Sequence, residues 1–300
     1  MTTYGAIELG GTWLRMATGH ADGRLLEQAR EPLPHPDELV RTVADWMRRR
    51  GPVRRLGVAS FGPIRLDRDA PDWGTILSTP KPGWSGIPLG RLLTDATQVD
   101  VLADTDVGAA ALGEHVLGAG RGCRTVAYLT VGTGIGVGIR MDGAGVRGRL
   151  HPELGHMRVS RDPGDAFEGV CPFHGDCLEG LASGPALLAR VGQMTGRVPP
   201  HHEAWVTEAR LLARGVHVLL SGLAIERVIL GGGVGTAPGL LPQVRAALRE
   251  VDAGYTHGLD PVIDLVAPHL GDNAGLVGAL MLAGRGLDVG TQDAPVRHPR

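Results

Sequence analysis

Lysine and cysteine are scarce in this sequence. Lys81 is the only lysine beside 29 arginines, a bias that we attribute to genome composition, and there are three cysteines in 300 residues. So few cysteines cannot build the disulfide framework of a secreted domain, which favours a reducing cytoplasm. An excess of positive charge is also missing, because the net charge is −2. A general nucleic-acid binder needs that excess to displace counterions from phosphates, so we expect no nucleic-acid partner.

Long apolar runs are absent as well. No stretch contains 18 uninterrupted apolar residues, and the first residues do not combine a basic segment with an apolar one. We therefore expect a soluble, cytoplasmic protein without a membrane partner. With 300 residues, of which 43% are apolar, the chain is longer than a single core usually grows, so we expect two domains.

Residues 151–184 contain three histidines and two cysteines, and two of the histidines and both cysteines are candidate metal ligands. Imidazole and thiolate are the ligands that a closed tetrahedral zinc site takes. The candidate ligands are His156, Cys171, His174 and Cys177. The last three follow one another at intervals of three in a short irregular segment. We interpret the segment as a zinc-held loop; the alternative is a pair of reduced cysteines and a core histidine.

Two glutamates are interleaved with these candidate ligands. Glu153 and Glu179 each lie within three residues of one of them. A bound metal would therefore fix the directions of both carboxylates. We infer that the loop could form one wall of a substrate site.

Two glycine turns join pairs of short apolar strands. The strands are expected at residues 4–9 and 14–18 around Gly10-Gly11-Thr12, and at 124–131 and 135–141 around Gly132-Thr133-Gly134. Glycines followed by a hydroxyl residue leave backbone N–H groups able to face an anion. An ordinary hairpin turn is the alternative for either one alone. Together, the two turns indicate an internal duplication that holds one anion from both sides.

The rest of the chain alternates strand and helix signals. Further strands are expected at 24–30, 56–60, 99–103, 227–230 and 262–266, and helices at 37–50, 107–117, 178–195, 203–223, 241–251 and 273–283. Residues 70–90 form a long turn-rich excursion of the kind that is often functional. Asp106 lies at a strand-to-helix junction, where a plain helix N-cap is one reading. Gly231-Gly232-Gly233 follows a strand and precedes a helix, a weak signal for close approach to a nucleotide.

Several of these motifs, in this order, resemble the ROK family (repressors, open reading frames, kinases), and most closely its zinc-containing bacterial fructokinase branch. The matching segments are ELGGT at 8–12, STPKPGW at 78–84, VGTGIG at 131–136, ELGH at 153–156, CPFHGDCLEG at 171–180, LGGGVG at 230–235 and GDNAGLVGAL at 271–280. The resemblance spans nearly the whole chain.

The resemblance implies an α/β protein with the actin-like ATPase, or ribonuclease H-like, fold. Two α/β domains are expected around a nucleotide and sugar cleft, at residues 1–108 and 109–285. The zinc loop at 151–184 belongs to the second domain. A C-terminal helix near 273–285 is expected to pack back on the first, and residues 286–300 are expected to form a flexible tail.

The resemblance also implies roles for individual residues, with ATP and Mg²⁺ as cofactors and a structural Zn²⁺. Asp106 becomes the general base, which replaces the plain-cap reading. The implied phosphate-binding residues are Gly10, Gly11, Thr12, Gly132, Thr133 and Gly134. Space for adenosine is left by Gly231, Gly232 and Gly233. Glu8 faces Mg²⁺ through water. The sugar-binding residues are Thr105, Asp106, Glu153, His156 and Glu179, and the zinc ligands are His156, Cys171, His174 and Cys177.

Three positions depart from the family pattern. Thr105 and Gly108 stand where asparagines are common, and Trp13 stands where a lysine usually follows GGT. The first two departures suggest a changed sugar preference. The third removes a cation from beside the phosphates.

The leading hypothesis is ATP-dependent phosphorylation of a hexose hydroxyl, from fructose to fructose 6-phosphate, by a homodimer. A kinase for glucose, mannose, an N-acetylhexosamine or a sugar-like biosynthetic intermediate is the alternative. A sugar-responsive repressor is disfavoured, because a strand begins by Tyr4 and leaves no room for a helix-turn-helix domain before it. A non-catalytic sugar-binding protein is disfavoured by Asp106.

Overall fold

The computed structural model describes residues 1–255 and 264–285, which divide into two compact units. Unit 1 comprises Met1–Ala109 and the chain from Gly275 onward, and unit 2 comprises Ala110–Ala274. Each unit is built on one five-stranded mixed sheet. The expected tail at 286–300, and the first part of the strand expected at 262–266, lie outside the described residues.

The sheet of unit 1 has the strand order β3-β2-β1-β4-β5. Its strands are β1 (Tyr4–Leu9), β2 (Trp13–Gly19), β3 (Leu25–Pro32), β4 (Arg55–Ser60) and β5 (Asp100–Thr105). The first three form an antiparallel meander, and β1, β4 and β5 run parallel. The central strands are buried on both faces, which explains why β1 and β4 show continuous apolar runs rather than alternation.

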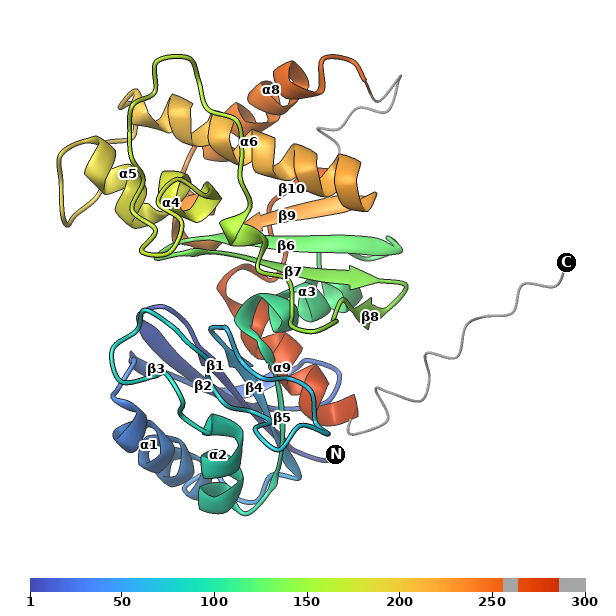
Figure 1. Cartoon of the computed structure of the whole chain (residues 1–300). Helices are drawn as coiled ribbons and strands as arrows, with labels where there is room; N and C mark the ends of the chain where they lie inside the picture. The colour runs from blue at the N-terminus through green and yellow to red at the C-terminus, as the bar shows by residue number, and fades with distance from the viewer. Residues whose placement is uncertain (256–263, 286–300) are drawn as a thin grey trace, which may run out of the picture. The chain divides into compact units, whose positions relative to one another are not determined.

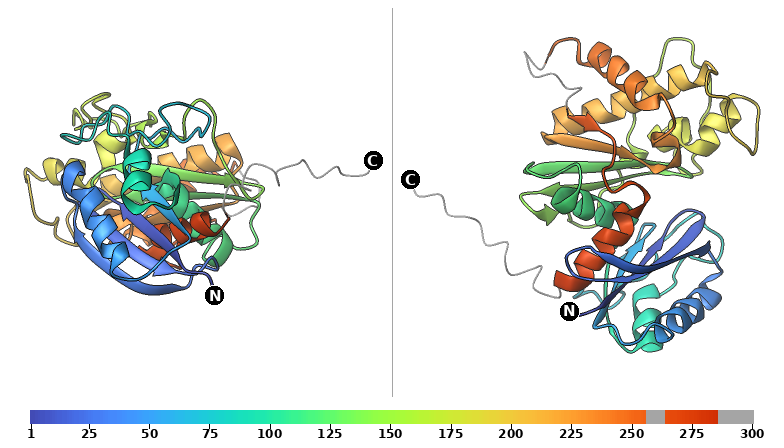
Figure 2. Two further views of the ribbon diagram at one scale, coloured as in Figure 1. Left: turned by 90° about the horizontal axis from the view of Figure 1, so that it is seen from below. Right: turned by 180° about the vertical axis from the view of Figure 1, so that it is seen from behind.

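Helices cover both faces of this sheet. On one face α1 (Pro36–Arg48) and α2 (Leu89–Thr97) contribute Leu39, Trp46 and Leu93 to a core with the strands. On the other face α9 (Ala274–Arg285) packs through Leu276, Ala279, Leu280 and Ala283, as the rear view in Figure 2 shows. Small residues allow this second contact to be close, because a Cβ on Gly57 of β4 would lie 1.9 Å from the carbonyl oxygen of Ala279.

The sheet of unit 2 repeats the topology of the first. Its strand order is β10-β9-β6-β7-β8, from β6 (Thr125–Val131), β7 (Ile135–Met141), β8 (Ala144–Gly145), β9 (Arg227–Gly231) and β10 (Leu265–Val266). As in unit 1, the first three strands are antiparallel neighbours and the last two join the first in parallel. Both glycine turns connect the first two strands of their sheets, as the internal duplication requires.

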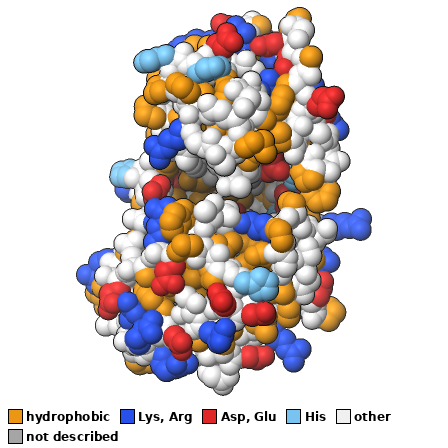
Figure 3. Space-filling model, turned by 90° about the vertical axis from the view of Figure 1, so that its left-hand side faces the viewer, with side chains coloured by type: hydrophobic (Ala, Val, Ile, Leu, Met, Phe, Trp, Pro, Cys, Tyr) orange, Lys and Arg blue, Asp and Glu red, His pale blue; other side chains and the backbone are white. Residues whose placement is uncertain are grey.

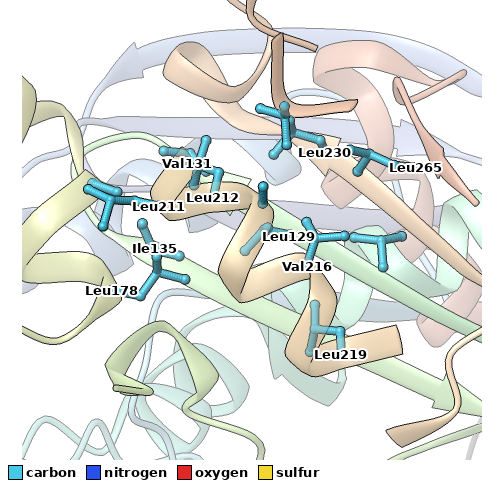
Figure 4. Close-up of a cluster of buried hydrophobic side chains, with 14 of the residues drawn as sticks. Leu129, Val131, Ile135, Leu178, Leu211, Leu212, Val216, Leu219, Leu230 and Leu265 are labelled. Atoms are coloured by element: carbon cyan, nitrogen blue, oxygen red, sulfur yellow. The ribbon is translucent and has the colours of Figure 1, made fainter. Parts of the chain in front are cut away.

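Two long helices lie side by side on one face of the second sheet (Figure 1). They are α6 (Ala204–Leu223) and α8 (Leu240–Asp252). Leu212, Val216 and Leu219 of α6 point toward Leu129 and Leu230 of the strands (Figure 4). The shorter elements are α3 (Asp106–Leu117), α4 (Leu178–Ala182), α5 (Gly184–Arg190), α7 (Gly232–Gly235) and single 3₁₀ turns at Leu154–His156 and Gly271–Asn273.

Three expectations for the chain path were wrong or incomplete. The single helix expected at 178–195 is two short helices, because Ser183 is extended and its side chain caps α5 by accepting from Ala186 N. The glycine run after β9 begins a helical turn of its own, α7, which was not expected. Helix α2 was not expected, because its nine residues directly follow the turn-rich excursion at 70–90.

The helices of the described residues are relevant to a membrane span, and one face of the surface to the distribution of charge. None of the helices in the described part of the chain is long and apolar enough to cross a bilayer. On the face drawn in Figure 3, acidic and basic side chains are interspersed over both units.

Replacement of Gly57 by alanine should loosen unit 1. The added methyl group would meet the backbone of α9 rather than a flexible side chain, so we expect a loss of about 2–3 kcal/mol in the free energy of unfolding, measured by urea titration. Gly222→Ala is the matched control, since Gly222 is exposed in α6 with no atom near its Cβ position. Equal stabilities for the two variants would contradict the close packing of α9.

Candidate functional site

Asp106 begins α3 directly after β5. Its Oδ1 accepts a hydrogen bond from Val107 N at 2.8 Å. The side chain is partly exposed, yet the surrounding protein removes enough water to raise its pKa to about 6, against the opposing effects of the Val107 N–H and the Lys81 ammonium. A carboxylate with such a pKa is ionised at neutral pH and is more basic than an ordinary aspartate.

The helix cap at this junction is Thr105, not Asp106. The hydroxyl oxygen of Thr105 accepts from Gly108 N at 2.9 Å, the contact that an N-cap makes with the third helical residue. A Cβ on Gly108 would lie 2.8 Å from that hydroxyl oxygen and 2.5 Å from Asp104 Oδ1. The departures from the family pattern at positions 105 and 108 are therefore linked. The Thr105 hydroxyl caps the helix by accepting from the N–H of residue 108, and its closeness leaves room there only for glycine.

Lys81 reaches the first glycine turn from the long excursion. Its Nζ donates to the carbonyl oxygens of Gly11 at 2.6 Å and Gly10 at 3.3 Å, and it lies 4.3 Å from the centroid of the Phe61 ring. Burial lowers the pKa of Lys81, and the negative charge of Asp106 opposes that shift. Our reading of the sequence assigned Lys81 no role. The available signal was its status as the only lysine in an arginine-rich chain.

The first glycine turn has a defined internal structure. Gly10 N donates to Trp13 O at 3.0 Å, and Thr12 O accepts from Leu33 N at 2.8 Å. The ring of Trp13, in place of the family's lysine, stacks under the guanidinium of Arg30 at 4.0 Å. A cation is therefore still present beside the end of the turn.

Glu8 is the penultimate residue of β1, and its carboxylate has a hydrogen-bond partner. Its Oε2 accepts from Arg15 Nη1 at 3.2 Å. A Cβ on Gly275 would lie 2.4 Å from Glu8 Oε1, so the carboxylate rests against the first turn of α9.

The four predicted metal ligands come together in unit 2. Their ligand atoms all lie within 4.8 Å of one another. His156 Nδ1 is 3.7 Å from Cys171 Sγ and 3.5 Å from Cys177 Sγ, and His174 Nδ1 is 3.7 Å from Cys171 Sγ. A short bridge between Cys171 and Gly175 folds the segment back on itself and brings the spaced ligands together.

The donor set fits a tetrahedral metal. Bonds of about 2.0–2.3 Å from a central zinc place its nitrogen and sulfur ligands roughly 3.5–3.6 Å apart, close to the separations seen. Burial raises the pKa of the Cys177 thiol, so a cation is needed to hold it as thiolate at neutral pH. Four protein ligands fill the tetrahedron and leave no position for a reacting group.

The two glutamates of the loop are held differently. Glu179 Oε2 accepts from Ile135 N at 2.9 Å, and its Oε1 lies 4.0 Å from His156 Nδ1. Glu179 therefore links the second glycine turn to the metal cluster. Glu153 Oε1 lies 3.3 Å from His151 Nδ1.

The second glycine turn and the glycine run are tightly packed within unit 2. Gly132 N donates to Gly134 O at 2.9 Å, and Gly132 O accepts from Gly184 N at 2.7 Å. A Cβ on Gly231 would meet the Tyr128 hydroxyl at 2.2 Å, and Gly232 has a φ of +83° beside the Val131 carbonyl. Internal packing thus explains Gly231 and Gly232, whereas Gly233 alone of the three has open space at its Cβ position.

Arginine–aspartate pairs anchor the segment that precedes the cysteines. Arg190 of α5 donates to both oxygens of Asp165 at 3.0 and 3.1 Å. Asp162 accepts from Arg210 and Arg214 of α6. The Arg190 hydrogen bonds hold the pKa of Asp165 at about 2, below its usual range.

Comparison with known proteins agrees with this architecture. The ROK family model matches residues 4–285. The chain is 40% identical to a fructokinase of Zymomonas mobilis, over 93% of this chain and 96% of the relative, and 36% identical to a putative fructokinase of Bacillus subtilis, over 98% and 99%. A ROK family glucokinase of Streptomyces griseus, solved with glucose and AMPPNP, superposes with a TM-score of 0.75 at 26% identity, over 95% of this chain and 100% of the neighbour.

The fold and its glycine turns define an α/β protein of the actin-like ATPase class, as predicted. The chain belongs to the ROK family. The resemblance found in the ordered motifs is thereby confirmed.

The anchor at Asp165 predicts a pH-dependent stability. Because its pKa is lowered on folding, Asp165 stabilises the fold above its unfolded pKa of about 3.9, and that contribution disappears as the pH falls toward about 2. We expect Asp165→Asn to cost about 1–2 kcal/mol at pH 7, allowing for partial solvent screening, with the difference from wild type shrinking below pH 4. Urea unfolding at several pH values measures this. The exposed Asp69→Asn is the control, and a pH-independent difference for Asp165→Asn would refute the anchor.

Proposed function

We propose that this protein catalyses ATP-dependent phosphorylation of a hexose hydroxyl, from fructose to fructose 6-phosphate. The observation that carries the proposal is Asp106, a carboxylate of raised pKa that directly follows the parallel strand β5. The ammonium of Lys81 acts on this carboxylate and also contacts the first glycine turn. The full-length match to proteins named fructokinases supports the choice of sugar.

Asp106 acts as the general base. Phosphoryl transfer depends mostly on positioning and charge stabilisation, and the attacking hydroxyl loses its proton late, so a weak base suffices. Asp106 orients that hydroxyl and accepts its proton.

The two glycine turns bind the phosphates of ATP through backbone N–H groups. The N–H groups of Gly10 and Gly132 are committed inside their turns. The donors in the proposal are therefore those of Gly11, Thr12, Thr133 and Gly134, with Gly233 leaving space for the adenosine. Glu8 faces Mg²⁺ through water, with its charge partly balanced by Arg15.

Sugar hydroxyls are held by Thr105, Glu153, His156 and Glu179. Glu179 keeps Oε1 for this task, because Oε2 accepts from Ile135 N. His156 uses Nδ1 toward the cluster, so its Nε2 faces the sugar.

The cluster of His156, Cys171, His174 and Cys177 holds a structural Zn²⁺. Cys171, Cys177, His156 and His174 would hold the ion, which would neutralise the two thiolates and so keep His156 and the neighbouring Glu179 in place. Thiolate ligands suit a reducing compartment such as the cytoplasm. A homodimer is proposed from the family alone.

A kinase for another sugar is the second candidate. The observation in its favour is the cap at Thr105, whose hydroxyl oxygen is used by Gly108 N and which lacks the paired donor and acceptor of an asparagine amide. The structural neighbour from Streptomyces griseus holds glucose.

Replacement of the proposed base should abolish turnover. In a coupled ADP-release assay over a panel of hexoses, we expect fructose to be the best substrate and Asp106→Asn to lower kcat by about 100- to 10,000-fold. Wild-type kcat/KM should rise as the pH increases through about 6, because Asp106 must lose its proton to act. The control is Asp95→Asn, an exposed carboxylate in α2. Full activity in Asp106→Asn would exclude Asp106 as the base.

Metal content tests the cluster. Elemental analysis of protein purified without added zinc should give about one zinc per chain, and Cys177→Ser should lose the metal and melt at a lower temperature. Cys123→Ser should retain both, because Cys123 lies outside the cluster. If wild-type protein is fully active without metal, Cys171 and Cys177 are ordinary reduced core cysteines and not metal ligands.

A further inference from the structure

The only lysine of the chain makes three specific contacts within unit 1. Its ammonium contacts two consecutive carbonyl oxygens, those of Gly10 and Gly11, and the face of the Phe61 ring. The other 29 residues of the combined lysine and arginine count are arginines. An ammonium donates in three directions from one compact centre, whereas the planar fork of a guanidinium is larger and donates within its plane. The contacts therefore suit lysine and would not accept arginine.

These contacts determine how two peptide planes are turned. In a trans peptide the C=O and the following N–H point in opposite directions. The carbonyl of Gly10 shares its plane with the N–H of Gly11, and the carbonyl of Gly11 shares its plane with the N–H of Thr12. When Lys81 draws both carbonyls to its side, both N–H groups point to the other side. Glycine has no Cβ to resist either orientation.

We propose that Lys81 is a positioning residue that sets the first glycine turn for anion binding, by fixing the N–H groups of Gly11 and Thr12 toward one face. The N–H of Gly10 is already used by Trp13 O, so these two are the donors that the turn offers. The identification of the anion as a phosphate of ATP rests on the proposed function. The orientation of the turn does not.

Lys81 has a second, separable effect through its charge. The charged groups that act on Asp106 are Lys81, which favours its ionised form, and Asp104, which opposes it. Removal of the ammonium should raise the pKa of Asp106, so that the acid limb of the pH–activity profile moves to higher pH. A variant that keeps the charge should leave the limb in place.

Two variants separate orientation from charge. Lys81→Met removes the donors and the charge, and Lys81→Arg keeps the charge but not the donor geometry. Both should raise KM for ATP by about tenfold or more, the value of losing a hydrogen bond to a charged group, with KM for fructose within about twofold. The acid limb should shift upward only in Lys81→Met. Arg41→Met, an exposed change on α1, is the control and should change neither.

Amide hydrogen exchange of residues 9–14, followed by mass spectrometry, tests the orientation without any turnover. We expect faster exchange in both variants and in wild-type protein whose amines have been reductively dimethylated. Reductive dimethylation modifies only Lys81 and the N-terminal amine. It keeps the positive charge of each amine and removes two of its three N–H donors. Because it is applied to folded wild-type protein, this test remains available if a variant folds poorly. Unchanged exchange, or a Lys81→Arg enzyme with wild-type KM for ATP, would overturn the proposal. Failure of wild type to phosphorylate any sugar would instead reject the proposed function, while the exchange result still decides the role of Lys81.

Discussion

Helix packing on both faces of the first sheet is the constraint on which the positions of its candidate site residues depend. Helices α1 and α2 on one side and α9 on the other leave no exposed face in the centre of the first sheet. Polar side chains can then emerge only where the parallel strands end. Glu8 is the penultimate residue of β1 and Asp106 follows β5, and the two glycine turns follow the carboxyl ends of β1 and β6. The positions open to chemistry are thus fixed by burial before any catalytic residue is chosen.

The parts that could be predicted from the sequence are those with a local signal. The two hairpins follow from apolar runs interrupted by glycine, and the junction at Asp106 follows from a strand that meets a helix. The close grouping of His156, Cys171, His174 and Cys177 was predictable because imidazole and thiol groups three residues apart are typical of metal-binding segments. The family resemblance added the proposed role of Asp106 as general base, whereas the local sequence alone favoured a helix cap.

The parts that escaped prediction depend on contacts between distant segments. Lys81 lies 70 residues from the carbonyl that it contacts most closely, and nothing in the excursion itself indicates that partner. Ser183 splits a helix through one side-chain cap, which competes with an unbroken apolar pattern. The close approach of Gly231 to the Tyr128 hydroxyl, and of Gly232 to the Val131 carbonyl, likewise gives no local signal, and it is a reason for glycine besides the predicted space for adenosine. In each case a tertiary contact decides between readings that the local sequence allows equally.

The position of α9 near the end of the sequence affects the order in which the two units can fold during translation. Unit 1 takes its first 109 residues from the start of the chain, but the helix that covers its second face begins only at Ala274. A ribosome must therefore complete all of unit 2 before Leu276 and Leu280 become available to Tyr4, Ala6 and Ala59. Until then the apolar face of the first sheet stays open to other chains or to chaperones. The unit that is translated first is the one whose core is completed last.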